Sequence, residues 1–272
     1  MKKIIVQMIV NKIEDRINLN QKIDLNDVVT LSGYSARYTQ KIFKDVTGVS
    51  ISKYIKKRIL TRGAILVKMT KKSISHIAMD LNFSTQQTFT RAFSREFKVS
   101  PLKFRKQRYF DCSYLTPSFI INSYDYKVYQ TYLSPLKLDG HNFFLKEGLL
   151  ENRVPRTNKI RLREISKIIK HHKQAFIMTT FSSQSTLESE VYLKTFIGYE
   201  YSRASLEVII GDCWAVDFVG VWSDYVTFGR LLTLYIKIKV EKIILEKITL
   251  GGKNDKGEQI YYITSFLPLL TI

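Results

Sequence analysis

The stretch SISHIAMDLNFSTQQTFTRAFSREFKVSPLKFRK, Ser73 to Lys106, has the pattern of a short helix, a tight turn and a longer helix packed on the first. In its first part apolar residues recur three or four positions apart, which places them on one helix face; they are Ile74, Ile77, Ala78 and Leu81. We expect the turn at Asn82-Phe83, because asparagine tolerates a positive φ better than other non-glycine residues. Ser84 or Thr85 then caps the next helix by accepting from its free N–H groups.

The second helix, about Thr85 to Phe97, divides its residues between two faces. Phenylalanine recurs every four residues on the face expected to be buried, at Phe89, Phe93 and Phe97. The opposite face carries Gln86, Gln87, Thr90 and Arg91. Glutamine pairs with an adenine edge, arginine with guanine, and threonine with a base or a phosphate. The pattern favours a helix that reads the DNA major groove, and the alternative is an ordinary solvated helix face, which carries the same residue types.

The same pattern occurs a second time, fifty positions earlier. The shift aligns Phe93 with Phe43, Val99-Ser100 with Val49-Ser50, and Phe104 with Tyr54. In this first copy the turn falls at Gly33-Tyr34 and the second helix at Ser35 to Val46. The helix presents Arg37, Gln40 and Lys41. The chain therefore contains an internal repeat with two candidate recognition helices.

Two further helices support these copies. Met1 to Asn18 is amphipathic, with isoleucines four residues apart at Ile5, Ile9, Ile13 and Ile17, and is expected to cover the core of the first copy. Ser52 to Lys68 joins the two copies. As a helix it spans about 25 Å at roughly 1.5 Å per residue. Such a strut holds two recognition helices near one DNA turn apart, roughly 34 Å.

These residues resemble the DNA-binding domain of the AraC/XylS family of transcription regulators, most closely its MarA, SoxS and Rob branch. The resemblance covers about Ile4 to Gln107 and rests on SGYSARYTQKIFK, QQTFTRAF and SPLKFR, at Ser32 to Lys44, Gln86 to Phe93 and Ser100 to Arg105. It implies an all-α domain with two helix-turn-helix motifs joined by a long helix. It also implies that Arg37, Gln40 and Lys41 read one major-groove segment, and Gln86, Gln87, Thr90 and Arg91 the next.

The chain departs from the family pattern within the first copy. Arg37 stands where close relatives carry an aromatic residue, Lys41 where they carry arginine, and Thr39 at a position that is usually apolar. Lysine does not reproduce the bidentate hydrogen bonding of arginine. The base preference of the first helix is therefore expected to differ from that of the relatives.

The positive charge is concentrated in the first part of the chain. The formal net charge is +19 over 272 residues; residues 1–109 hold 23 Lys/Arg against 7 Asp/Glu, net +16, which leaves net +3 for residues 110–272. This asymmetry indicates a polyanionic partner, and the doubled motif selects double-stranded DNA over a membrane surface. No stretch reaches 18 apolar residues, and the first residues become charged too early for a secretory segment. We therefore expect a cytoplasmic, nucleoid-associated protein.

The sequence contains no motif typical of an enzyme active site or of a metal site. The four histidines, His76, His141, His171 and His172, form no HExxH arrangement, and no GxSxG, P-loop or GxGxxG motif is present. Cys112 and Cys213 lack metal-ligand spacing and are expected as buried thiols; a redox pair between them is the alternative. The sequence thus predicts no catalytic residue, no metal and no cofactor.

After Lys106 the chain becomes rich in aromatic and β-branched residues. Tyr109 to Ser118 has no sustained period and is expected to be a connector. Two helices are predicted beyond it, at Lys159 to His172 and after Gly220. The predicted strands are Phe119 to Leu133, Ala175 to Phe181, Val191 to Tyr199, Ser205 to Ile210, Trp214 to Phe218 and Ile260 to Phe266. The pattern indicates an α+β class, so we expect a multidomain chain with residues 1–108 binding DNA, 109–118 connecting, and 119–272 forming the second domain.

The C-terminal half resembles the GyrI-like ligand-binding domains, which contain two pseudo-repeats of helix and strands around a central cleft. The resemblance rests on GDCWAVDFVGVWSDYVTF, Gly211 to Phe228, and on PLL at Pro268 to Leu270. It implies a cleft for hydrophobic, often cationic, small molecules, with aromatic walls and an acidic residue. The candidate lining residues are Tyr199, Glu200, Tyr201, Trp214 and Trp222. The alternative is that these are packing aromatics and a surface glutamate.

The sequence therefore predicts a sequence-specific DNA-binding transcription regulator. The family resemblance implies an activator, with RNA polymerase as a partner and a hydrophobic or cationic small molecule as effector. Tandem motifs in one chain favour an asymmetric site bound by a monomer. Two alternatives concern the C-terminal half: a protein-interaction module without a small ligand, or a small-molecule hydrolase, as some GyrI-like proteins are.

Overall fold

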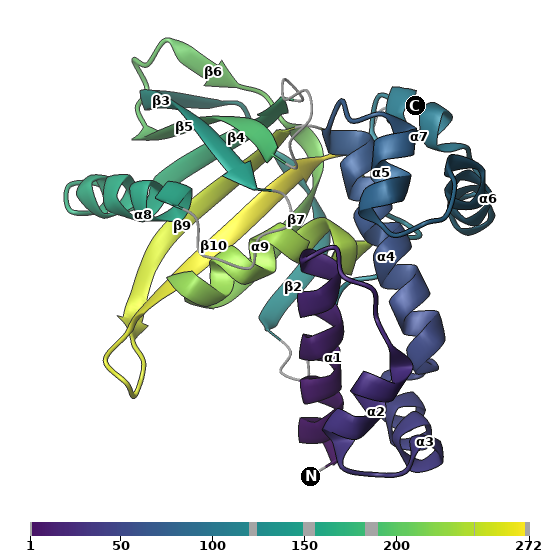
Figure 1. Cartoon of the computed structure of the whole chain (residues 1–272). Coiled ribbons are helices and arrows are strands. Elements are labelled where there is room, and N and C mark those ends of the chain that lie inside the picture. Colours follow the sequence, from purple (N-terminus) through teal and green to yellow (C-terminus); the bar gives the residue numbers. More distant parts are fainter. Residues whose placement is uncertain (1, 120–123, 149–155, 183–189, 242, 270–272) are drawn as a thin grey trace.

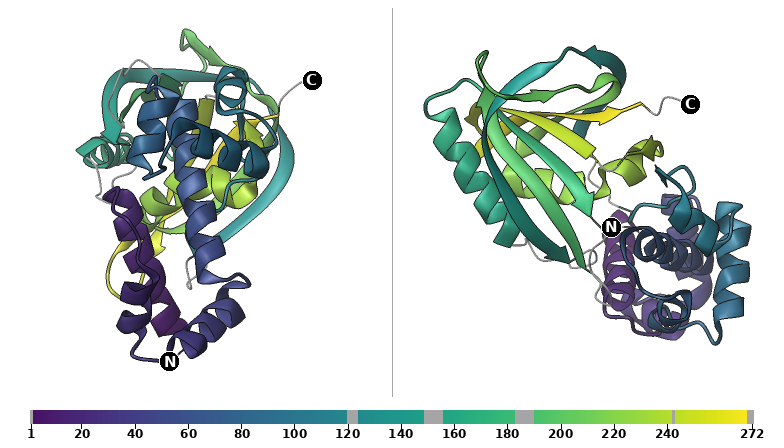
Figure 2. Two further views of the ribbon diagram at one scale, coloured as in Figure 1. Left: turned by 45° about the vertical axis from the view of Figure 1, so that its right-hand side comes forward. Right: turned by 90° about the horizontal axis from the view of Figure 1, so that it is seen from above.

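A computed structural model describes residues 2–119, 124–148, 156–182, 190–241 and 243–269. A helical region comes first along the chain, and a curved eight-stranded sheet with two further helices follows it (Figure 1). The views in Figure 2 show the helical region beside the sheet. Among the described helices, none is both long and apolar enough to cross a membrane.

The helical region contains both predicted motifs. Its helices are α1 Lys2–Asn18, α2 Leu25–Ser32, α3 Ala36–Thr47, α4 Ile51–Met69, α5 Ile74–Asp80, α6 Gln86–Phe97 and α7 Pro101–Lys106. The N-terminal helix, the strut and both second helices of the motifs are confirmed within one or two residues. Thr85 rather than Ser84 caps α6, since its side chain accepts from the Thr88 N–H at 3.1 Å.

The fifty-residue repeat is visible in the caps and turns of the two copies. Ser50 caps α4 and Ser100 caps α7, each accepting from the N–H three residues later. The residues that end α3 and α6, Gly48 and Lys98, both adopt the left-handed conformation, with φ of 77° and 62°. The two copies therefore repeat in backbone conformation as well as in sequence.

Three unusual residues of the sequence have structural reasons. Thr39 is fully buried, and its hydroxyl lies 2.6 Å from that of Ser32 and donates to the Ser35 carbonyl, so the polar group is satisfied inside the core. Asn82 adopts the predicted positive φ, 59°, and its side chain donates to the Asn20 carbonyl at 2.8 Å. A Cβ at Gly63 would lie 3.0 Å from a methyl group of Leu81 and 3.0 Å from the ring of Phe89, so glycine lets α4 approach the end of α5 and α6 closely.

The sheet region is built from a β-α-β-β unit that occurs twice. The strand order is β2-β7-β10-β9-β4-β5-β3-β6. The first unit is β3, α8, β4 and β5, with spatial order β4-β5-β3, and the second is β7, α9, β9 and β10, with order β9-β10-β7. The units meet where β4 and β9 pair antiparallel, with Ile177 opposite Glu246. The bounds are β2 Asp125–Leu133, β3 Leu136–Gly148, α8 Arg156–Ile169, β4 Ala175–Ser182, β5 Glu190–Glu200, β6 Leu206–Val208, β7 Gly211–Val221, α9 Trp222–Ile236, β9 Ile243–Lys253 and β10 Gln259–Pro268.

Most sequence-predicted elements of this region are confirmed. Two long strands, β3 and β9, were missed, and so were two strands of two residues each, Phe110–Asp111 and Lys239–Val240. β3 and β9 contain glycines and charged residues, so their alternation of apolar and polar residues is weak. Their strand conformation is decided by hydrogen bonding along their length to neighbouring strands. Helix α8 begins and ends three residues earlier than predicted. Residues 120–123 of the first predicted strand, and Leu270 of the PLL motif, lie outside the described residues.

The predicted connector is packed against both regions. Phe110–Asp111 forms strand β1, which pairs with β8, Lys239–Val240. Cys112 and Leu115 are buried in a hydrophobic cluster that extends from the C-terminal half of α4 to the sheet and α9. A segment without periodicity can thus be ordered entirely by tertiary contacts, which the sequence pattern does not reveal.

Replacing Gly63 by valine should lower the free energy of unfolding by about 1–3 kcal/mol, because the added side chain overpacks α4 against α5 and α6. The helix propensity of valine exceeds that of glycine, so propensity alone predicts the opposite sign. Urea unfolding measures the difference. Lys56→Val, on an exposed part of α4, is the matched control and should cost clearly less; equal losses would contradict the close packing.

The thiol of Cys112 should resist alkylation in the native protein. Burial raises its pKa to about 12, and the side chain is inaccessible. With iodoacetamide at pH 8, mass spectrometry should find Cys112 unlabelled until denaturant is added. Rapid labelling without denaturant would show that the connector is open in solution.

Candidate nucleic-acid interface and cavity

Helix α3 exposes the three residues predicted to contact DNA in the first copy. Thr39, Ile42 and Phe43 are buried, and this fixes the orientation of the helix. Arg37, Gln40 and Lys41 lie on the opposite face, at spacings of three and four residues, and all are exposed. Within the described residues, their side chains form no hydrogen bond or ion pair. They are therefore available to an external partner.

Helix α6 presents the second predicted set in the same way. Phe89, Phe93 and Phe97 are buried in successive turns, and Phe93 lies within 5.4 Å of Phe104 on α7, centroid to centroid. The four predicted DNA contacts lie on the other face: Gln86, Gln87 and Arg91 are exposed, and Thr90 is half-buried. Among the described contacts these side chains also have no protein partner.

The strut sets the separation of the two recognition helices. Helix α4 has 19 residues, about 28 Å at roughly 1.5 Å per residue. In Figure 1, α3 and α6 lie at opposite ends of α4, and both lie on the side away from the sheet. The sheet region therefore leaves the exposed faces of both helices uncovered.

A half-buried ion pair fixes α1 and the connector against the strut. Arg58 on α4 donates from Nε and Nη2 to the two carboxylate oxygens of Glu14, both at 2.7 Å, and from Nη1 to the Thr116 carbonyl at 2.5 Å. The hydroxyl of Tyr54 donates to Glu14 and accepts from the Phe119 N–H. Burial, together with Glu14, raises the pKa of Tyr54 above its ordinary value, so the phenol stays a donor.

A second arginine of α4 ties the strut to the end of α1. Arg62 donates to Asn18 and to the side chain of Asn20. Burial lowers the pKa of Arg62 to about 10, and the guanidinium remains charged at neutral pH. Thr61 on the same helix accepts from the Thr116 N–H at 2.9 Å. The strut is therefore held by polar contacts along its length as well as by its apolar faces.

The five candidate ligand residues are divided between two places. At the end of β5, the Tyr199 ring stacks on His172 at 3.7 Å and its hydroxyl donates to Asp139. Its neighbours Glu200 and Tyr201 are exposed. Trp214 is half-buried on β7, whereas Trp222, at the start of α9, is buried and lines a cavity. Of the five, the structure brings only Trp222 to this cavity.

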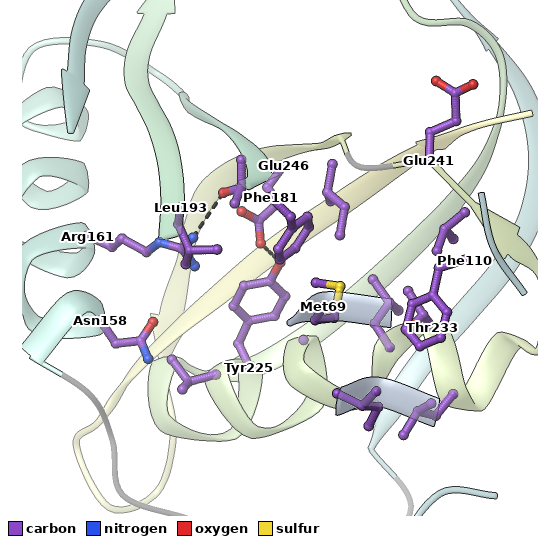
Figure 3. Close-up of a pocket in the computed structure, with 18 of the residues that line it drawn as sticks. Met69, Phe110, Asn158, Arg161, Phe181, Leu193, Tyr225, Thr233, Glu241 and Glu246 are labelled. Atoms are coloured by element: carbon purple, nitrogen blue, oxygen red, sulfur yellow. Dashed lines mark hydrogen bonds between the residues drawn. The ribbon is translucent and has the colours of Figure 1, made fainter. Parts of the chain in front are cut away.

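The cavity has a volume of about 210 Å³ and lies between α8, α9, the sheet and the end of α4 (Figure 3). Its walls are mainly apolar, with Phe110, Phe181 and Leu193 among the lining residues. Polar side chains reach it from α8, α9 and β9. They include Asn158, Arg161, Tyr225 and Glu246. In Figure 3 Arg161 enters from α8, and Tyr225 rises from α9 toward Glu246.

Tyr225 and Glu246 form a buried hydrogen-bonded pair at the centre of the sheet. The Tyr225 hydroxyl donates to the Glu246 carboxylate and lies 3.1 Å from the hydroxyl of Ser265. Burial, and then the carboxylate, raise the pKa of Tyr225 well above its ordinary value. Glu246 was not predicted because β9 was missed. The signal in the sequence was the alternation of Glu246 with Ile244 and Ile248, which places this glutamate on a buried strand face.

Comparison with known proteins agrees with this architecture. A model described as a helix-turn-helix domain matches residues 29–107. A putative HTH-type transcriptional regulator, YkgA of Escherichia coli K12, is 32% identical over 196 residues, 71% of this chain and 81% of YkgA. Regulatory protein SoxS of Salmonella typhimurium is 38% identical over 101 residues, 37% of this chain and 92% of SoxS.

Another relative matches over a shorter stretch. The right origin-binding protein of Escherichia coli K12 is 40% identical over 89 residues, which are 33% of this chain and 31% of that protein. The match to YkgA, in contrast, is too long to be confined to the helices. With two exposed recognition helices on one strut and these matches, the chain belongs to the AraC-type helix-turn-helix family of DNA-binding transcription regulators.

Proposed function

We propose that this regulator reads an asymmetric promoter site as a monomer, with α3 and α6 in successive major-groove segments. The carrying observation is that both helices expose unpartnered polar faces at opposite ends of one strut, on the side away from the sheet. Arg37, Gln40 and Lys41 contact one segment. The second set, Gln86, Gln87, Thr90 and Arg91, contacts the next. Base-edge contacts of this kind supply specificity, and each good pair discriminates by about 1–3 kcal/mol.

The phosphate backbone supplies the sequence-independent part of the affinity. Residues 1–109 carry net +16, and neutralising phosphates releases counterions, so binding weakens as salt rises. The helix caps add to this, because backbone N–H groups at a helix N-terminus favour anions. The charge and the two helices therefore act on the same DNA.

We infer that the C-terminal half is a GyrI-like effector domain. The repeated β-α-β-β unit supports this, as does a cavity where the two units meet, lined by an aromatic pair and a buried glutamate. The proposed division is residues 1–108 for DNA binding, 109–118 as connector and 119–272 for the effector. Activation through contact with RNA polymerase, and association with the nucleoid, are proposed from the family resemblance alone.

Selection of bound sequences from a random DNA pool, with the full-length chain at about 0.15 M salt, tests the geometry. We expect a single asymmetric motif of about two major-groove segments, because the two motifs lie in tandem in one chain. A palindromic motif would show that a dimer binds. Recovery of no motif would show a non-specific basic binder.

Arg91→Ala or Gln40→Ala should weaken binding to the selected site by about 1–3 kcal/mol and relax base preference at one position. Fluorescence anisotropy with selected and scrambled DNA measures the difference. Arg203→Ala removes one charge from an exposed position of the sheet region, and as a matched control should change both affinities little. Equal losses on both DNAs for Arg91→Ala would mean that this residue contacts only phosphate.

A further inference from the structure

The positive charge of the C-terminal half is concentrated in one segment. Residues 157–173 hold six Lys/Arg against one Asp/Glu, net +5. The remaining residues of 110–272 hold 14 Lys/Arg against 16 Asp/Glu, net −2. The net charge of +3 on this half of the chain therefore comes from helix α8 and the turn that follows it.

Helix α8 divides its residues between the sheet and the solvent. Ile165 is fully buried, and Leu162 and Ile168 pack half-buried against the same core. The opposite face is basic, with exposed cations three or four residues apart. These cations form the α8 basic stripe and are Lys159, Arg163, Lys167, Lys170 and Lys173. The last two follow the end of the helix at Ile169.

One carboxylate neutralises part of the stripe. Glu164 accepts from Arg163 at 2.9 Å and from Lys167 at 3.0 Å, but the side chains of these two cations remain 65% and 61% exposed. Exposed ion pairs of this kind contribute little to stability. The other three cations of the stripe form no side-chain hydrogen bond or ion pair with any described residue. The stripe therefore keeps an excess of positive charge that the described part of the chain does not balance.

The second β-α-β-β unit shows that the fold does not require this charge. Its helix α9 takes the equivalent place in the unit and contains one acidic and one basic residue, Asp224 and Arg230. Helix α8 packs on β3, β4 and β5 through its apolar face alone. The basic face is thus a property of the α8 sequence, and folding of the unit gives no reason for it.

The stripe lies on the other side of the sheet from the recognition helices. In Figure 1 α8 is at the left of the sheet and both α3 and α6 are at the right, and the view from above in Figure 2 gives the same separation. A duplex held by α3 and α6 would have to turn back around the sheet to reach α8. Bending 20–30 bp by only 40–90° already costs about 1–6 kcal/mol. The stripe therefore suits a separate polyanion.

We propose that the α8 basic stripe binds the phosphate backbone of a second DNA segment, so that one chain bridges two duplexes. From Lys159 to Lys167 the stripe is about 12 Å long at roughly 1.5 Å per residue. B-DNA carries one negative charge per roughly 1.7 Å of its axis, so this length faces several phosphates. The apolar face of α8 is buried against the sheet, which leaves no face to insert into a lipid surface and favours DNA over a membrane.

This contact goes beyond the proposed promoter reading, because it lies on another face of the molecule and reads no bases. Phosphate contacts position a protein on DNA and carry no sequence information directly. The second segment is therefore bound whatever its sequence, and its binding weakens as salt rises.

Capture of a second duplex tests the bridge. The full-length chain is bound to its selected site on immobilised DNA at about 0.15 M salt, and a fluorescent duplex of scrambled sequence is added. We expect this duplex to be retained. The triple variant Lys159→Gln/Arg163→Gln/Lys167→Gln should retain it roughly tenfold more weakly, with a slope of log affinity against log salt reduced by about three, since three phosphate contacts are lost. Its binding to the selected site should stay unchanged.

A control variant with the same change in charge separates the stripe from net charge. Lys137, Lys253 and Lys256 are exposed elsewhere in the sheet region, and replacing all three by glutamine should leave capture of the scrambled duplex unchanged. Thermal unfolding of each variant shows whether it folds, and Lys167→Gln alone decides the outcome if the triple stripe variant does not. Equal losses in the stripe and control variants would overturn the assignment.

The remaining outcomes distinguish this proposal from the proposed function. If the unmodified chain binds its selected site and retains no scrambled duplex, the bridge alone is overturned. Loss of sequence-specific binding by the unmodified chain refutes the promoter reading instead. Vesicles of phosphatidylglycerol and phosphatidylcholine are titrated in parallel, and stripe-dependent binding to them in place of the second duplex would overturn the choice of DNA.

Discussion

The burial of α4 is the constraint on which the rest of the structure depends. Its N-terminal half, through Ile51 and Tyr54, belongs to the core of the first motif, and its C-terminal half, through Leu60, Ala64 and Val67, belongs to the cluster of the second. One helix therefore contributes residues to two separate hydrophobic cores. Because an α-helix has a fixed rise per residue, the separation of α3 and α6 follows from its length.

The same helix carries the sheet region. The cluster around Leu60 and Ala64 continues through Cys112 and Leu115 to Phe218 and Phe228 without interruption. Protein interiors are close-packed, so displacement of one wall is felt by its neighbours. A displacement of the sheet relative to α4 would therefore change the packing around the helix that supports α3 and α6.

Some buried polar groups are well satisfied, whereas others have no partner among the described residues. In the helical region, Arg58 with Glu14 and Tyr54 is satisfied by several hydrogen bonds, which specifies how α1, α4 and the connector meet. At the cavity, Arg161 and Trp222 each keep a donor without an acceptor. Arg62 on α4 has a buried Nε in the same situation, and each such group lowers the stability of the fold.

The sequence by itself determined the two helix-turn-helix motifs and their recognition faces. Helices of this kind can be predicted from neighbouring residues alone. Phe89, Phe93 and Phe97 repeat at helical spacing. The helix starts are marked by Ser50, Thr85 and Ser100. The seven predicted DNA contacts lie where that spacing places them, although their contacts with DNA stay a prediction.

Only the tertiary structure decided the connector, the strands β3 and β9, and the cavity. Strand pairing and side-chain burial come from residues distant in the chain, such as Tyr225 with Glu246 and Thr61 with Thr116, and no local period reports such contacts. Of the five residues that the family resemblance suggested for a cleft, only Trp222 lines this cavity. Glu246 and Arg161 line it because the fold brings α8 and β9 together.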